Sequence, residues 1–145
     1  MNTEFKRPEL EDRDTIMHYF SLQKSRGCEC TFSCVYLWAR FYHVEYAIME
    51  DMMVFKCGKE DPFFDFPYGE EKNVKAAIEA IRAYCEKENI EFCLGQVTPE
   101  QFAILEQLYP DTFEIFYDRN IADYVYEREK LANLSGKKYH GKKNH

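Results

Sequence analysis

The last nine residues carry the densest group of side chains that could bind an anion. Residues 137–145 contain four lysines and no acid. The candidate binding residues are Lys137, Lys138, His140, Lys142, Lys143 and Asn144. Lysine ammonium groups hold phosphate oxygens and position a nucleic-acid backbone without reading its sequence. This basic tail is therefore a candidate site for phosphate or RNA, and a solvated interdomain linker is the alternative.

A second candidate anion site is the turn at residues 67–73, which precedes the longest helical pattern. A helix N-terminus holds phosphate on its backbone N–H groups when a glycine-rich loop allows close approach. This turn has one glycine, Gly69, and one cation, Lys72, next to Tyr68. Those three residues are candidate contacts for coenzyme A. A proline and two adjacent acids oppose that function, so an ordinary strand-to-helix turn is favoured, and no cofactor is expected in this chain.

Other reactive groups are less specific. Cys28, Cys30 and Cys34 lie close in sequence, but a structural zinc site needs a second pair of ligands, and His43 has no companion. Free thiols are favoured over a metal site. His140 and His145 could act as bases near neutral pH, yet no partner carboxylate can be identified. No catalytic residue is assigned.

Composition limits the class of protein. Without the basic tail, 15 basic groups face 26 acidic ones, so the body is too acidic to bind nucleic acid nonspecifically over its whole surface. Hydrophobic residues make up 46% and aromatic residues 17% of the chain, which excludes disorder. No segment reaches the roughly 18 apolar residues of a membrane span. The N-terminus lacks the apolar core of a secretory signal, so we expect a cytoplasmic protein with reduced cysteines.

Hydrophobic spacing predicts the elements that would position these groups. A helix is expected over residues 9–20, and Thr31 is a candidate N-cap for an aromatic helix over residues 32–40. The apolar face of the first helix should hold Leu10, Ile16, Met17 and Phe20.

Strand patterns follow these helices. A short strand is expected at Phe5, and residues 43–49 and 52–57 should form a hairpin around a two-residue turn. Residues 63–66 lie between two prolines and should form the next strand.

The second half of the chain alternates helices and strands. A long helix should run from about residue 73 to 88, with five apolar residues on its core face. These are Val74, Ala77, Ile78, Ile81 and Cys85. A strand at 90–94 precedes a helix that starts with the capping box of Thr98 and ends before Pro110. Aromatic strands are expected at 113–117 and 122–127.

The expected element order is (β)–α–α–β–β–β–α–β–α–β–β. This order predicts an α/β (α+β) fold with a mixed sheet and flanking helices, and it is the order of the GNAT (acyl-CoA N-acyltransferase-like) fold. The abundant tyrosines and phenylalanines could stack on bases or a lipid tail, but core and interdomain packing is favoured. An apolar face left exposed would favour a homodimer.

The chain resembles the family of the phosphatidylglycerol lysyltransferase catalytic domain, in particular small bacterial members of unknown function that contain two GNAT-like domains. The resemblance rests on Phe5, the acidic segment 11–14, Cys30-Thr-Phe32 with Trp38, Phe66-Pro67-Tyr-Gly69, Asp123-Tyr-Val-Tyr126, Leu131, Leu134-Ser-Gly-Lys137 and residues 139–145. It implies that residues 1–136 form the N-terminal GNAT-like domain and that residues 137–145 lead into a second one.

That resemblance also implies a function. The chain would be one half of an acyl- or aminoacyl-transferase, supplying scaffold and part of the acceptor cleft. The donor for the full-length protein would be acyl-coenzyme A or aminoacyl-tRNA. The partners implied are the second domain and either tRNA or coenzyme A. The alternative is a GNAT-like domain that binds a partner without catalysis.

Overall fold

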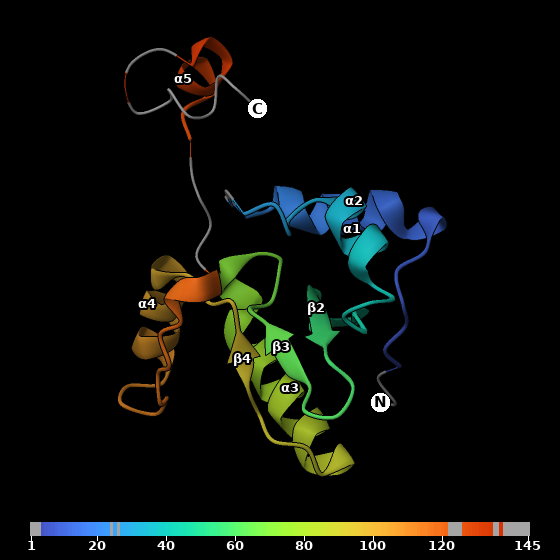
Figure 1. Ribbon diagram of the computed structural model, residues 1–145. Helices are drawn as coiled ribbons and strands as arrows, with labels where there is room; N and C mark the ends of the chain where they lie inside the picture. The colour runs from blue at the N-terminus through green and yellow to red at the C-terminus, as the bar shows by residue number, and fades with distance from the viewer. Residues whose placement is uncertain (1–3, 24, 26, 122–125, 135–136, 138–145) are drawn as a thin grey trace. The chain divides into compact units, whose positions relative to one another are not determined.

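The computed structural model describes residues 4–23, 25, 27–121, 126–134 and 137. By backbone contacts the chain divides into two compact units, Met1–Glu114 and Ile115–His145. The first unit contains a four-stranded sheet with helices α1 to α4 (Figure 1). The fold is therefore a mixed α+β fold, as the sequence pattern predicts.

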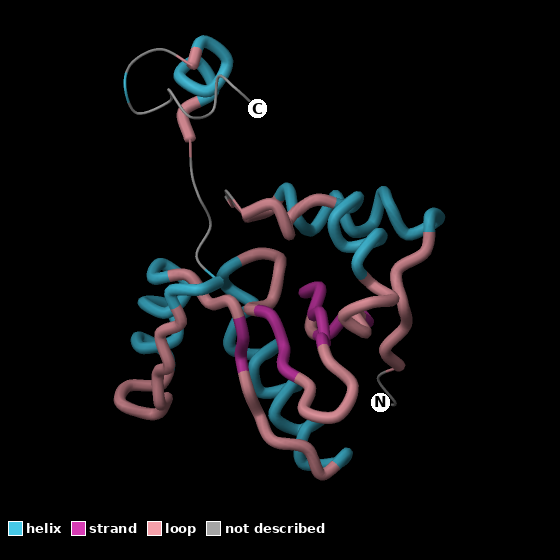
Figure 2. Tube along the Cα trace, in the orientation of Figure 1, coloured by secondary structure: helices cyan, strands magenta, loops and turns pink. Residues whose placement is uncertain are grey.

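The sheet follows chain order, β1–β2–β3–β4 (Figure 2). Strands β1 (Glu45–Met49), β2 (Met52–Cys57) and β3 (Phe63–Asp65) pair antiparallel, and β4 (Leu94–Gly95) pairs parallel to β3. The expected hairpin is confirmed: Glu50 and Asp51 have φ of 51° and 57°. Two successive residues with positive φ match a turn whose twist suits a two-residue hairpin.

Helix α3 (Val74–Glu88) makes the crossover that the parallel pair requires. All five apolar residues predicted for its core face are buried, and they are Val74, Ala77, Ile78, Ile81 and Cys85. The helix ends at Asn89, which adopts the left-handed conformation that closes many helices.

Strand β2 is buried on both faces and divides the core in two. Met52 and Val54 pack with α3, whereas Met53 and Phe55 pack with α1 and α2. Successive side chains of a strand point to opposite faces, so one short segment contributes to both clusters. The cluster that contains Met53 and Phe55 leaves part of its face of the sheet uncovered.

Helices α1 (Arg13–Ser21) and α2 (Phe32–Trp38) cover that second face. Ile16 and Phe20 are buried, but the prediction that Leu10 and Met17 share their face is wrong, since these two are 60% and 40% exposed. Leu10 lies in a separate 3₁₀ turn, whose three residues per turn change its direction. Met17 follows Ile16 directly and is therefore rotated about 100° away from the buried stripe.

Helix α4 (Pro99–Leu108) begins with the predicted capping box. Thr98 Oγ1 accepts a hydrogen bond from the backbone N–H of Gln101 at 3.3 Å, and Gln101 Oε1 accepts one from the Thr98 N–H at 2.9 Å. None of the helices that the structure describes has the length and apolar character needed to cross a membrane.

Two expected strands differ from the structure. Residues 113–117 are irregular, and Phe116 and Tyr117 are more than four-fifths exposed, so the strand predicted there is wrong. High β-propensity forms a strand only when a neighbouring strand pairs with it. Of the strand expected at 90–94, only Leu94 lies in a strand, as the first residue of β4. Of the strand expected at 122–127, residues 122–125 lie outside the described residues.

The second unit contains short helical segments among its described residues. A 3₁₀ turn occupies Arg119–Ile121, and helix α5 occupies Arg128–Asn133.

Candidate functional site

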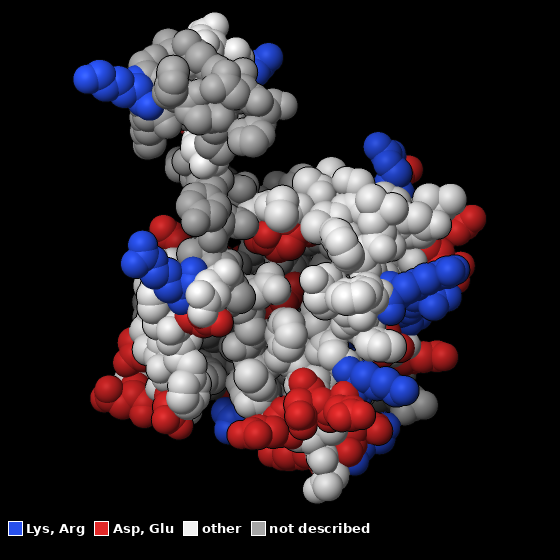
Figure 3. All heavy atoms as spheres, in the orientation of Figure 1, with Lys and Arg blue, Asp and Glu red and all other residues white. Residues whose placement is uncertain are grey.

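A pocket opens where helices α1 and α2 leave one face of the sheet uncovered. Its volume is about 270 Å³, and all of its lining residues belong to the first unit. Figure 3 shows a hollow on this face in which acidic side chains lie among uncharged ones. The fourteen lining residues are Phe20, Glu29, Cys34, Val35, Trp38, Tyr42, Val44, Phe55, Cys57, Gly58, Phe63, Asp65, Tyr68 and Gln96.

Strand periodicity explains which sheet residues reach the pocket. Phe55 and Cys57 alternate along β2, and Phe63 and Asp65 alternate along β3. Cys57 is the register partner of Phe63, so the two strands present these side chains together. The intervening residue Phe64 points to the α3 side, where it is fully buried.

Helix α2 supplies the opposite wall. Thr31 caps its N-terminus, because the Thr31 hydroxyl accepts a hydrogen bond from the Cys34 N–H at 3.3 Å. Cys34 and Trp38 are four residues apart and therefore share a helix face, and both line the pocket. Trp38 is 50% exposed, so it contributes a ring at the mouth of the pocket and not in the protein core.

Asp65 carries the unusual electrostatics of the site. Its Oδ1 atom is shielded from solvent and has no hydrogen-bond partner among the described residues. Burial, with a smaller contribution from the nearby charge of Glu29, raises the pKa of the Asp65 carboxyl to about 7. An acid with such a pKa can exchange a proton near neutral pH, as a general acid or base must.

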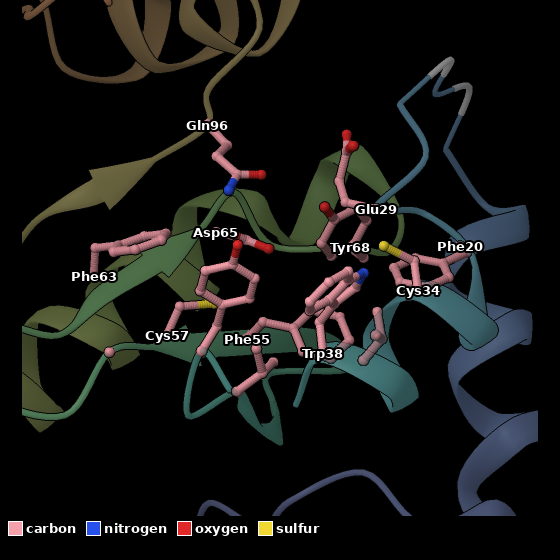
Figure 4. Close-up of a pocket in the computed structure, with 14 residues that line it drawn as sticks. Phe20, Glu29, Cys34, Trp38, Phe55, Cys57, Phe63, Asp65, Tyr68 and Gln96 are labelled. Carbon is pink, nitrogen blue, oxygen red and sulfur yellow. The ribbon is translucent and has the colours of Figure 1, made fainter. Parts of the chain in front are cut away.

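Three further polar groups accompany Asp65. In Figure 4 the polar ends of Glu29, Tyr68 and Gln96 lie on the same side of the view as Asp65, with Trp38, Phe55 and Cys57 below them. Burial raises the pKa of the Tyr68 phenol far above its usual range, so Tyr68 stays neutral. The Tyr68 oxygen accepts a hydrogen bond from the Cys30 thiol at 3.7 Å. The polar side of the pocket therefore combines two acids with a neutral phenol and an amide.

Gln96 has a backbone conformation that ordinary residues adopt rarely. Its φ is 56°, in the left-handed region, and it directly follows β4. Such strain of a non-glycine residue tends to occur at functional positions. Here it coincides with a side chain that lines the pocket.

Of the three residues predicted to contact coenzyme A, only Tyr68 lines the pocket. Tyr68 is buried and lines the pocket, and its backbone pairs with Met53 at 2.8 Å in both directions. Gly69 follows it but is absent from the lining, and Lys72 is exposed and forms an ion pair with Glu70 at 2.5 Å.

The basic tail lies almost entirely outside the described residues. Lys137 is described and exposed. The remaining candidates, Lys138, His140, Lys142, Lys143 and Asn144, fall outside the part of the chain that the structure describes. An anion site in this tail remains a prediction.

The cysteine cluster and the aromatic residues can also be placed. Cys28 is exposed, and Cys30 and Cys34 are half-buried. No group of three possible metal ligands occurs among the described residues. Of the aromatic residues, Tyr46 is in the core as expected, whereas Phe41 and Tyr42 are 71% and 55% exposed beside Trp38.

A second, more polar cavity of about 510 Å³ lies near Arg7, His43 and Lys56. Its most buried cation, Lys56, already forms an ion pair with Glu45 at 2.7 Å and lies 4.8 Å from the centre of the Phe5 ring. This cavity therefore offers no unpaired buried charge comparable to Asp65.

Sequence reasoning did not identify Asp65, Glu29 or Gln96 as site residues. One signal was available for Asp65: it is the only charged residue within the apolar strand pattern Phe63-Phe-Asp-Phe66. A charged side chain in such a strand needs a partner, a route to solvent or a function. Nothing comparable distinguishes Glu29 or Gln96, because both lie in loops.

Comparison with known proteins gives two matches. A family model described as "Phosphatidylglycerol lysyltransferase, C-terminal" matches residues 20–145. A crystal structure described as a conserved protein of unknown function from Bacteroides thetaiotaomicron VPI-5482 is 34% identical, with a TM-score of 0.88. The match covers 98% of this chain and 48% of that one, so this chain spans about half the length of the Bacteroides protein. No curated protein matches.

Proposed function

The chain belongs to the family described as phosphatidylglycerol lysyltransferase, C-terminal, and from this membership we propose that it is one half of an aminoacyl- or acyl-transferase that supplies part of the acceptor cleft. The family match supports transfer of an aminoacyl group as the chemistry. The pocket around Asp65 supports the assignment to the acceptor side.

The finer architecture belongs to the same proposal. Three antiparallel strands followed by a helical crossover to a parallel strand support a GNAT-like fold. The length of the Bacteroides protein, about twice that of this chain, supports a second domain in the complete protein. That domain would carry the donor site.

The observation that carries the proposal is the Asp65 carboxyl in an open, mostly apolar pocket, where its Oδ1 atom has no hydrogen-bond partner among the described residues. Burying a carboxylate without a partner is costly, so a structural purpose would not explain its position. A pKa near 7 suits a base that removes a proton at neutral pH. Asp65 is thus the residue that we assign to the acceptor.

The proposed step is a direct transfer. A neutral amine or a hydroxyl of the acceptor gives a proton to the Asp65 carboxylate as its nitrogen or oxygen forms a bond to the carbonyl carbon of the donor. An amine that binds as an ammonium ion first loses one proton to water. The ester or thioester bond of the donor breaks, and the leaving oxygen or sulfur takes up a proton. Holding acceptor and donor together supplies most of the acceleration, and no covalent enzyme intermediate is required.

The donor is proposed to be aminoacyl-tRNA, with acyl-coenzyme A as the second possibility. The turn at 67–73 opposes coenzyme A, because Lys72 is already paired with Glu70 and Glu71 adds further negative charge. The basic tail from Lys137 favours RNA, since its lysines are suited to phosphate contacts.

A transfer assay tests this function. The complete protein, including the proposed second domain with the donor site, is incubated with radiolabelled lysyl-tRNA or acetyl-coenzyme A and with amine or hydroxyl acceptors, and labelled product is separated. We expect transfer that Asp65→Asn abolishes and that Asp61→Asn, an exposed acid four residues earlier, leaves unchanged. Transfer that is insensitive to Asp65→Asn would contradict the role given to this residue.

The alternative function is a non-catalytic domain that binds a partner. The acidic turn at 67–73 favours it, since this turn is poorly suited to hold a donor phosphate. Saturable ligand binding without transfer to any acceptor would support this alternative.

A further inference from the structure

We infer that the Asp65 pocket binds an ammonium group carried on a small apolar body, which makes the acceptor of the transfer an amine and not an anionic phospholipid. The binding site is argued from the pocket alone. The identification of its ligand as the acceptor rests on the proposed function.

The charges of the lining select a cation. Two of the fourteen described lining residues, Asp65 and Glu29, are acids, and none of the fourteen is a lysine, arginine or histidine. A phosphate or carboxylate would meet like charge there without any compensating cation, which disfavours its binding. An ammonium ion would instead provide the partner that Asp65 Oδ1 lacks among the described residues.

Among the described residues of the first unit, no neighbouring cation takes that place. Lys56 precedes Cys57 on β2, so strand alternation directs its side chain to the opposite face from Cys57. There it is held by Glu45 at 2.7 Å and by the Tyr84 hydroxyl at 3.4 Å. Since no described residue supplies a positive charge there, a cationic ligand is the source that we propose.

The remaining lining suits the apolar body of such a ligand. Six of the described lining residues are aromatic, and they are Phe20, Trp38, Tyr42, Phe55, Phe63 and Tyr68. The negative face of an aromatic ring attracts a cation, and rings grouped around an acid are a recurrent way to hold alkylammonium ions. A volume of about 270 Å³ fits a short alkylamine or a choline-sized group better than a nucleotide.

Binding of a cation should be coupled to proton release. Burial raises the pKa of Asp65 to about 7, and a bound ammonium group would lower it again by favouring the charged form. Among the described residues, Glu29 from the loop before α2 is the other carboxyl that faces the pocket. The other titratable groups near Asp65 are those of Cys30, Cys34, Cys57, Tyr42 and Tyr68. Burial raises the pKa of the Cys57 thiol to about 12, so this neighbour stays neutral between pH 5 and 8.

The first experiment compares choline with its uncharged isostere 3,3-dimethylbutan-1-ol. Trp38 is the only tryptophan of the chain and lines the pocket, so its fluorescence reports occupancy directly. We expect saturable binding of choline that is at least ~10-fold tighter than that of the isostere. Equal affinities, or tighter binding of inorganic phosphate, would overturn the inference.

Single substitutions test whether Asp65 is the residue that binds choline. Asp65→Asn should weaken choline binding at least ~10-fold, while Asp61→Asn should leave it unchanged. Circular dichroism and thermal melting establish that each variant is folded. A folded Asp65→Asn protein that binds choline as tightly as the parent would refute the assignment.

A pH series gives a readout that a purely structural carboxyl would not produce. Choline keeps its charge at every pH, so any change in its affinity with pH reflects the ionisation of groups on the protein. Its affinity should rise by up to ~10-fold per pH unit between pH 5 and 7 and level off above, as Asp65 ionises. A flat profile would contradict the inference.

The two proposals can fail separately. Choline binding without transfer to any acceptor would leave the ammonium site intact and remove the transferase function. Transfer to a hydroxyl of phosphatidylglycerol vesicles, without transfer to amines and without choline binding, would support the transferase and overturn the amine acceptor.

Discussion

Asp65 and Gly95 lie opposite each other in the parallel pair of strands β3 and β4. A Cβ atom placed on Gly95 would come within 2.3 Å of Cδ2 of the Phe63 ring, far closer than real contacts allow. The ring of Phe63 therefore lies over the Gly95 backbone, beside the acid. A missing side chain on β4 gives the pocket one of its aromatic walls.

Replacing Gly95 tests this arrangement. Gly95→Ala should force the Phe63 ring to move, destabilise the protein by about 1–3 kcal/mol and change the shape of the pocket. Denaturant unfolding followed by Trp38 fluorescence measures the free energy of unfolding. When Phe63 is already alanine, Gly95→Ala should cost much less free energy of unfolding than it costs in the parent protein. Additive losses in this cycle would show that the ring does not oppose the new methyl group.

Asp65 should make stability depend on pH in an unusual direction. Its pKa is about 7 in the folded protein against an ordinary value of 3.8, so the folded state binds a proton more readily than the unfolded state. Stability from this group therefore falls as pH rises from about 4 to about 7 and then levels off. Asp65→Asn should remove this loss and stabilise the protein by up to about 4 kcal/mol at pH 8.

Urea unfolding of parent and variant between pH 4 and 8 measures that difference. The exposed Asp61 provides the matched control, because Asp61→Asn should shift stability by a similar small amount at every pH. A difference for Asp65→Asn that does not grow with pH would mean that its folded pKa is near normal.

The left-handed backbone of Gln96 predicts a preference for glycine. Gln96→Gly should be more stable than Gln96→Ala by about 0.5–1 kcal/mol, because only alanine keeps the steric cost of φ at 56°. Chemical denaturation of the two variants gives the comparison. At Glu86, an exposed position within α3, the order should reverse, with glycine less stable than alanine by about 1 kcal/mol.

The capping box of α4 should contribute measurably to stability. Thr98→Ala removes the acceptor for the Gln101 N–H and should cost about 1 kcal/mol. Thermal or urea unfolding detects a change of this size. Thr112, whose hydroxyl donates to the Pro110 carbonyl in an exposed loop, is the control, and Thr112→Ala should cost less than about 0.5 kcal/mol.

The basic tail can be tested through salt dependence. Changing Lys137, Lys138, Lys142 and Lys143 to alanine should weaken binding of a short single-stranded RNA. The slope of log affinity against log salt should become shallower by about 3, since each phosphate contact contributes about 0.7. Fluorescence anisotropy at several salt concentrations measures both effects.

A control variant distinguishes a specific RNA-binding site in the tail from a general effect of removing positive charge. It replaces four exposed lysines of the acidic body, namely Lys59, Lys72, Lys75 and Lys87. If this variant lowers affinity and slope as much as the tail variant, the tail is not a specific RNA contact.

Much of the scaffold could be predicted from the sequence, because its signals are local. Three features depend only on residues that are close together in the sequence. They are the apolar stripe of α3, the Glu50-Asp51 turn and the cap at Thr98. Their spacing alone determines which side of a helix is apolar or where a hairpin reverses. The strand predicted at 113–117 failed because strand formation depends on a partner that the local pattern does not specify.

The candidate site could not be predicted in the same way. The sequence marks Asp65 as a charge within an apolar strand, but its unpartnered oxygen follows from the packing of segments that are distant along the chain. Glu29 reaches the pocket from the loop before α2, and Gln96 reaches it from the residue after β4. The sequence by itself determined the periodic elements and the family. Only the tertiary structure decided which acids share a pocket and how far burial raises the pKa of Asp65, because desolvation depends on every neighbour in space and not on spacing along the chain.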